Sequence, residues 1–155
     1  MNEVNKAREL FLEGFNCSQS VFCAFCHRFD IDEDTAKKIS AGLGGGIGRQ
    51  REVCGAVSGA AMVLGSIAAA TNGDDNKSKA ENYELVREFC ERFKALHETI
   101  ICRDLLRLSA EKKETAKPDD RTAAYYKNRP CLKIVEDAAE ILTKMIEEKN
   151  KKIGL

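Results

Sequence analysis

Residues 53–73 contain no charged side chain, and this stretch constrains the fold more than any other part of the chain. It is long enough to cross a membrane as a helix. However, it consists mostly of Gly, Ala and Ser, and no second stretch of this kind occurs. We therefore expect a helix that is buried at the centre of the fold, with other helices packed around it, and no association with a membrane.

The composition favours helices over sheets. Only 2 prolines and no tryptophan occur among the 155 residues, and long runs of Val, Ile and Thr are missing. The chain length and the apolar fraction of 43% suit one domain with a core of its own. We predict an all-α, single-domain bundle of about five or six helices over residues 1–155, with a Gly-rich loop before the buried small-residue helix.

Apolar residues recur at helical spacing, and local signals mark where the helices start. Asn16 and Asp32 are good N-caps, and Pro130 suits the first position of the last helix. Residues 109–129 are charged and poor in apolar side chains, so we expect a long loop there. The helices are predicted over about residues 4–13, 17–29, 33–41, 53–70, 80–96 and 101–108, and from Pro130 onward.

The charge balance and the N-terminal segment indicate the partners and the compartment. The 25 Lys and Arg residues balance the 25 Asp and Glu residues, so no net field would recruit nucleic acid or an anionic membrane. Residues 1–14 lack a basic region followed by an apolar one, so we expect no signal peptide and a cytoplasmic location. In that compartment the 7 cysteines are expected to be thiols, metal ligands or redox groups.

Four cysteines, Cys17, Cys54, Cys102 and Cys131, fall in the first turn of a predicted helix, and we refer to them as the helix-start cysteines. A helix N-terminus presents free N–H groups and the positive end of the macrodipole, which stabilise a thiolate and lower its pKa. The four are therefore predicted to be redox thiols or metal ligands. Cys54 follows two arginines and is the predicted attacking thiolate.

The other three cysteines, Cys23, Cys26 and Cys90, fall inside predicted helices among phenylalanines. Cys23, Cys26 and His27 form a C-x-x-C-H pattern, which is typical of covalent haem attachment. The three residues would share one helix face, but haem attachment requires export, for which we see no signal. We therefore expect small packed side chains here rather than haem or a metal site.

The segment before the central helix is the second candidate for binding a cofactor. Gly44, Gly45 and Gly46, followed by Arg49 and Arg51, form a loop that leads into a helix N-terminus and could cradle an anion. No Lys-Ser/Thr pair follows, so this is not a phosphate-binding loop of the Walker A type.

Small residues continue inside the central helix itself. Glycine costs about 1 kcal/mol relative to alanine in a helix interior, so Gly55 and Gly59 need compensation. Close approach of a cofactor or of another helix would supply that compensation. The sequence leaves both explanations open.

These segments together resemble a known family. The residues FNCSQSV (15–21), GLGGGIGRQREVCGAVSGA (42–60) and IICRDL (100–105), with Cys131 before the last helix, resemble the redox-active family named for its C-GCAxxG-C-C pattern. The central element here reads CGAVSG, a CGAxxG form. The resemblance implies that the helix-start cysteines are the functional set. The chain is also similar to the non-haem part of split-Soret cytochromes c, for which an iron–sulfur site has been suggested.

Three functions remain open at this point. In the first, the helix-start cysteines converge and hold an iron–sulfur cluster or zinc for electron transfer with an unknown redox partner. In the second, they cycle a disulfide without any cofactor. In the third, they fill the core of a helical scaffold that binds a partner. A homodimer is the default expectation for the oligomeric state.

Overall fold

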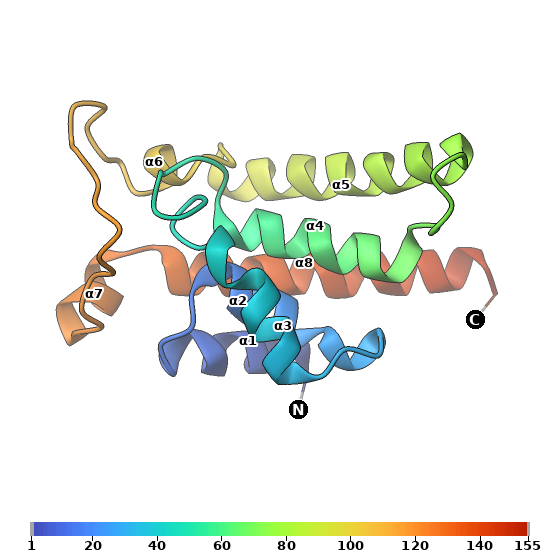
Figure 1. The fold of residues 1–155 in the computed structure, drawn as a ribbon, viewed down its shortest axis with the longest axis horizontal. Helices are drawn as coiled ribbons and strands as arrows, with labels where there is room; N and C mark the ends of the chain where they lie inside the picture. The colour runs from blue at the N-terminus through green and yellow to red at the C-terminus, as the bar shows by residue number, and fades with distance from the viewer. Residues whose placement is uncertain (1, 155) are drawn as a thin grey trace.

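The structure is a computed structural model that describes residues 2–154, and it is all-helical as predicted. Its centre is α4 (Gly55–Ala68), the helix formed by the uncharged stretch. α4 packs against α2 (Cys17–Ala24), α5 (Asn76–His97) and α8 (Cys131–Lys152). Figure 1 shows α4, α5 and α8 running side by side, with the shorter α1 (Glu3–Leu12), α2 and α3 (Glu33–Ser40) along one side of them.

Glycines let α4 approach α2 so closely that the backbones touch. A Cβ added to Gly59 would lie 2.8 Å from the carbonyl oxygen of Ser18, and one added to Gly55 would lie 3.0 Å from the Ser18 nitrogen. Dispersion contacts across this interface offset the low helix propensity of glycine. The structure therefore explains Gly59 by helix packing.

Local capping sets the starts of the helices, as the sequence predicts. The Asn16 side chain accepts a hydrogen bond from the Gln19 amide, and the Gln19 side chain accepts one from the Asn16 amide, at 3.0 Å each. Asp32 caps α3 in the same way through the Thr35 amide. Pro130 stands one position before its predicted place, as the N-cap residue of α8.

The helix predicted over residues 17–29 is shorter than expected. α2 ends at Ala24, and a 3-10 helix, η1 (Cys26–Arg28), follows it. This tighter turn lets the Phe29 ring stack on the Phe22 ring with their centroids 5.3 Å apart. Two positions seven residues apart on an unbroken α-helix are about 10 Å apart, so the stacking requires the break.

The prediction of a loop over residues 109–129 is wrong for the C-terminal part of this segment. Residues 123–128 form α7 (Ala123–Asn128), which Thr122 caps through the Tyr125 amide. Tyr125 and Tyr126 of this helix both pack against Phe11. The segment is poor in apolar residues, but its two tyrosines pack against α1 and become partly buried.

Six of the eight α-helices in residues 2–154 have eight residues or more, in line with the predicted bundle. The other two are α7 and α6 (Cys102–Leu105), which is shorter than the helix predicted over residues 101–108. Arg107, which has a φ of 55°, turns the chain away soon after α6. Within the described residues, no helix is both long and apolar enough to cross a bilayer.

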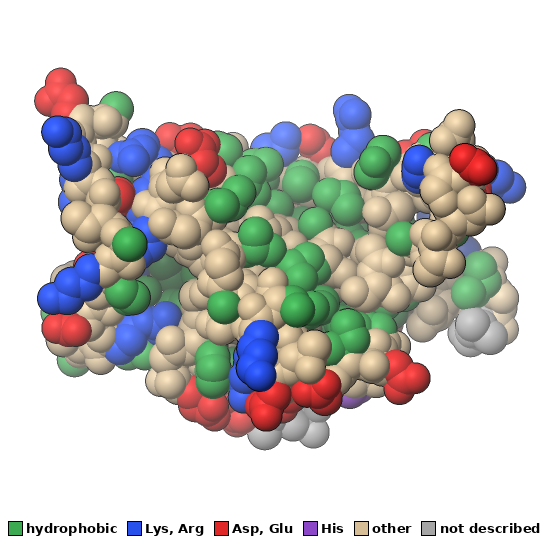
Figure 2. Space-filling view, viewed as in Figure 1, with side chains coloured by type: hydrophobic (Ala, Val, Ile, Leu, Met, Phe, Trp, Pro, Cys, Tyr) green, Lys and Arg blue, Asp and Glu red, His purple; other side chains and the backbone are tan. Residues whose placement is uncertain are grey.

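Figure 2 shows apolar side chains gathered over the middle of one face of the molecule, with charged side chains along its edges. Ile39 of α3 and Ile47 of the Gly-rich loop are among the exposed large apolar residues. Scattered exposed apolar residues are common on monomers as well. The homodimer expected from the sequence therefore stays a prediction.

Replacing Gly59 with alanine should lower the free energy of unfolding by about 1–3 kcal/mol, because the added methyl group overpacks the contact with α2. The matched control is Gly65→Ala on the same helix, where a Cβ would meet nothing within 4 Å. There alanine should raise the free energy of unfolding by up to about 1 kcal/mol through helix propensity. Urea denaturation measures both changes, and equal effects would contradict the close contact.

Candidate functional site

All four helix-start cysteines line one cavity of about 310 Å³. This cysteine cavity lies at the end of the bundle where the Gly-rich loop, α6 and α7 come together (Figure 1). The predicted residues Gly44, Gly45, Gly46, Arg49, Arg51 and Gly55 also line it. Gly59 is not part of its lining, because it faces α2.

Four separate helix starts supply the four thiols. Cys17, Cys102 and Cys131 are the first residues of α2, α6 and α8, and Cys54 is the N-cap residue of α4. The positions predicted from the sequence are therefore confirmed, whereas their role as redox thiols or ligands stays a prediction. The cavity receives the positive ends of the helix dipoles of α2, α4 and α8, which favour negative charge.

A short β-bridge joins the starts of α4 and α6. Val53 and Ile101 pair in the antiparallel sense. The Cys54 amide donates to the Ile100 carbonyl at 2.8 Å, and the Cys102 amide donates to the Glu52 carbonyl at 2.7 Å. These bonds bring together two cysteines that are far apart in the sequence.

The Gly-rich loop folds back on itself before it reaches Cys54. The amides of Arg51 and Glu52 donate to the carbonyls of Gly45 and Gly46 at 3.0 and 2.9 Å. Gly46 has a φ of 70°, and a Cβ there would lie 2.6 Å from the Glu52 nitrogen. Only glycine fits this position, and the tight loop places two arginine side chains at the cavity.

Cys17 and Cys131 are neighbours in the cavity, and the ionisation of each affects that of the other. The Cys17 thiol donates to Cys131, which raises the pKa of Cys17 well above its usual range and lowers the pKa of Cys131 to about 7. The guanidinium groups of Arg129, Arg121 and Arg51 also lower the pKa of Cys131, against the effect of burial. Cys131 is therefore the most acidic thiol of the cavity.

The role of Cys54 as the attacking thiolate stays a prediction, and the burial of its thiol does not favour it. Burial raises the pKa of Cys54 to about 12, although the amides of Ala56 and Val57 act in the opposite direction. Burial also raises the pKa of Cys102, against the hydrogen bond that Arg51 donates to its sulfur at 3.7 Å. At both positions, the rise in pKa caused by desolvation is larger than the fall in pKa caused by the helix N-terminus.

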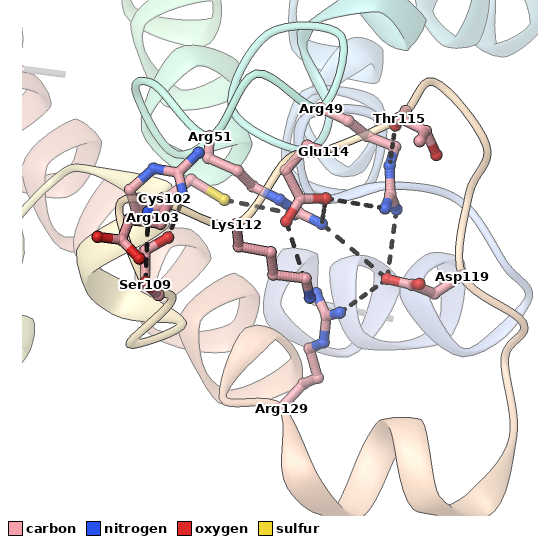
Figure 3. A network of polar contacts seen from close by, with 11 residues as sticks. Arg49, Arg51, Cys102, Arg103, Ser109, Lys112, Glu114, Thr115, Asp119 and Arg129 are labelled. Carbon is pink, nitrogen blue, oxygen red and sulfur yellow. Dashed lines mark hydrogen bonds and ion pairs between the residues drawn. The ribbon is translucent and has the colours of Figure 1, made fainter.

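A cluster of arginines and carboxylates (Figure 3) borders the cavity, and Arg49, Arg51, Asp119 and Arg129 are part of its lining. Arg49 and Arg51 come from the Gly-rich loop and Arg129 precedes α8, whereas Glu114 and Asp119 come from the segment between α6 and α7. Glu114 and Asp119 were not predicted as site residues, because their segment was expected to be a long loop. The presence of carboxylates in this polar segment was the only feature of the sequence that could have indicated ion pairs with the arginines.

Arg121 is another residue of the lining that the sequence analysis missed. Its guanidinium group donates to the carbonyl oxygens of Phe11 and Phe15 at 2.9 and 3.0 Å. It also lies over the Phe11 ring, 4.4 Å from the centroid. Arg121 thus ties α7 to α1 and adds a further positive charge to the cavity.

The C-x-x-C-H residues lie outside the cysteine cavity. Because α2 ends at Ala24, Cys26 and His27 do not continue the helix that carries Cys23, although Cys23 and Cys26 are both buried. Cys23 is buried, which raises its pKa to about 11, whereas the His27 side chain is 63% exposed and pairs with Glu3. Cys90 of α5 also lies away from the cavity.

The spacing of the ligands matters for the kind of metal centre. Across residues 2–154, no three His, Cys, Asp or Glu side chains stand close enough together to hold one metal ion. A single tetrahedral zinc has Zn–S distances of about 2.3 Å, which requires a much tighter group. The four thiols share a cavity without forming such a group.

Fold and site together define an all-helical protein with four thiols around one cavity. The chain matches the family described as "Putative redox-active protein (C_GCAxxG_C_C)" over residues 15–145. That range contains all four helix-start cysteines, and the protein belongs to this family. Comparison with curated proteins and with solved structures found no match.

In protein freed of metal by a chelator, the rate at which iodoacetamide alkylates Cys131 should rise as the pH passes through about 7. The thiolate is the nucleophile, so the rate should level off once Cys131 is deprotonated. Cys54, with a pKa of about 12, should react slowly at the same pH values. Mass spectrometry of the digested peptides measures each rate, and preferential alkylation of Cys54 would contradict the assignment.

Proposed function

We propose that this is an electron-transfer protein in which Cys17, Cys54, Cys102 and Cys131 hold an iron–sulfur cluster. One observation carries the proposal: four thiols from four helix starts line a single cavity of about 310 Å³. The family to which the chain belongs is described as redox-active, which agrees with it. When bound, such a cluster supplies one-electron transfer.

We prefer a cluster to zinc because the ligands of a cluster need not surround a single point. One zinc ion would need its ligands gathered around a single point, and no group of three ligands meets that condition within residues 2–154. An iron–sulfur cluster contains several metal atoms, so its cysteine ligands are spread over a wider span. The cavity offers room for that wider arrangement.

The surroundings suit a negatively charged group. Arg51 is only 4% exposed and donates to the Cys102 sulfur, so it would stabilise a thiolate ligand there. Hydrogen bonds and positive charges next to a cluster favour its more reduced state and raise its reduction potential. The residues that hold the centre would thus also adjust its potential.

Burial keeps most of these thiols protonated until a metal binds. The pKa values of Cys54 and Cys102 are raised by desolvation, so ligation would release their protons. The same burial limits the access of water to the ligands. A metal-free protein would therefore hold mostly neutral thiols.

Iron and acid-labile sulfide, measured with a visible spectrum on protein purified without oxygen, test the proposal. Both elements should be present in near-equal amounts, and Cys54→Ser should lose most of them. Cys90→Ser is the matched control, because Cys90 lies on α5 outside the cavity and should leave the content unchanged. Zinc without sulfide, or equal loss in both variants, would contradict the proposal.

A second candidate is thiol–disulfide exchange, which the hydrogen bond between Cys17 and Cys131 favours. The Cys131 thiolate would attack a partner disulfide, form a mixed disulfide and release one partner thiolate. Cys17 would then attack Cys131, form the internal S–S bond and release the second partner thiolate. The partner disulfide gains two electrons, and the two protein thiols lose them.

Oxidised glutathione distinguishes this candidate in the metal-free protein. Exchange predicts that Cys17→Ser traps glutathione on Cys131, whereas the wild type gains an internal disulfide and holds no adduct. Intact-mass measurement reads both outcomes. Failure of Cys131 to form either product would exclude the exchange mechanism.

A further inference from the structure

The segment between α6 and α7 crosses the cysteine cavity without forming a helix. Arg103 donates to the Ser109 carbonyl at 2.8 Å at one end of this segment, and Arg121 binds the Phe11 and Phe15 carbonyls at the other. We call residues 110–120, between these two anchors, the strap. In Figure 1 the strap lies in the extended yellow and orange stretch at the end of the bundle. Its residues Ala116, Pro118 and Asp119 line the cavity.

Ion pairs fasten the strap to the rim of the cavity (Figure 3). Glu114 accepts from Arg49 at 3.2 Å and from Arg51 at 3.3 Å. Asp119 accepts from Arg129 at 2.7 Å and from Arg49 at 3.3 Å. Two carboxylates of the strap thus meet three arginines of the rim.

Apolar burial contributes little to holding the strap in place. None of residues 110–120 belongs to the hydrophobic core or to the apolar side chains packed against it. The backbone of the strap also accepts a hydrogen bond from Arg49 Nε, at the Thr115 carbonyl, at 2.9 Å. The closed position therefore depends on charge. Salt should weaken the more exposed Asp119 pairs most, because the pairs of Glu114 with Arg49 and Arg51 are largely buried and are screened less.

Two buried atoms of this network oppose the closed position. Arg51 Nε and Glu114 Oε1 have no hydrogen-bond partner among the described residues. The Lys112 ammonium, 3.9 Å from Glu114 Oε1, is too distant to donate a hydrogen bond. Leaving such atoms unsatisfied is unfavourable, and water would satisfy both if the strap lifted. The ion pairs and this desolvation penalty act in opposite directions.

We propose that residues 110–120 are a lid that gates the cysteine cavity, with Glu114 and Asp119 as its latch on Arg49, Arg51 and Arg129. When the latch breaks, the lid swings about its anchors at Ser109 and Arg121. The cavity thiols then become accessible to reagents, metal and redox partners. This inference concerns access to the thiols, so it holds whether the cavity carries a cluster or a dithiol.

Alkylation of Cys131 in the metal-free protein at about pH 9 tests the gate, since its thiolate is then already formed. The two probes are iodoacetamide, which is small, and a bulky fluorescein maleimide. In the wild type, labelling by the bulky probe should rise several-fold from low salt to about 1 M salt, where the Debye length is about 3 Å. The double variant Glu114→Gln, Asp119→Asn should label about fivefold faster at low salt and lose the salt dependence.

Control measurements separate opening of the lid from other effects. The variant Glu111→Gln, Asp120→Asn removes the same charge from exposed strap residues that form no ion pair within residues 2–154, and it should behave like the wild type. Cys23 lies in the core and should stay unlabelled throughout. Salt-independent labelling of the wild type would overturn the proposal. So would equal rates in the two double variants, or labelling of Cys23 in parallel with Cys131.

Discussion

The close contact between α2 and α4 is the constraint on which the rest of the structure depends. Without a side chain at Gly55 and Gly59, the start of α4 lies directly against the start of α2, and this brings Cys54 toward Cys17. The Val53–Ile101 bridge then carries Cys102 to the same place. α8, packed on α1, α2 and α4, adds Cys131. The assembly of the cysteine cavity therefore depends on the close packing of α2 against α4 in the core.

Burial and charge work against each other in this cavity. Removing thiols from water raises their pKa values, which holds Cys54 and Cys102 in the neutral form. The anionic form prevails only at Cys131, where the hydrogen bond from Cys17 lowers the pKa most and the arginines add to its effect. The helix N-termini and arginines thus favour negative charge in the cavity, but most of the thiols would lose their protons only when a metal ion or cluster binds.

Much of the fold could be predicted from the sequence because its signals are local. The Asn16 and Asp32 caps, the uncharged stretch and the apolar spacing located seven of the eight α-helices in residues 2–154 and put four cysteines at helix starts. α7 escaped prediction because its stability comes from tyrosines that pack on the distant Phe11. The pKa of Cys54 also escaped prediction, since burial is a tertiary property. The pairing of Glu114 and Asp119 with the arginines had no local signal either.

Anomalous diffraction at the iron absorption edge, from crystals grown without oxygen, would test the central claim most directly. An iron–sulfur cluster predicts a group of iron peaks inside the cysteine cavity, each iron within bonding distance of one or two of the sulfurs of Cys17, Cys54, Cys102 and Cys131. A cavity without iron that contains a Cys17–Cys131 disulfide, or an iron peak at Cys23 and Cys26, would contradict it.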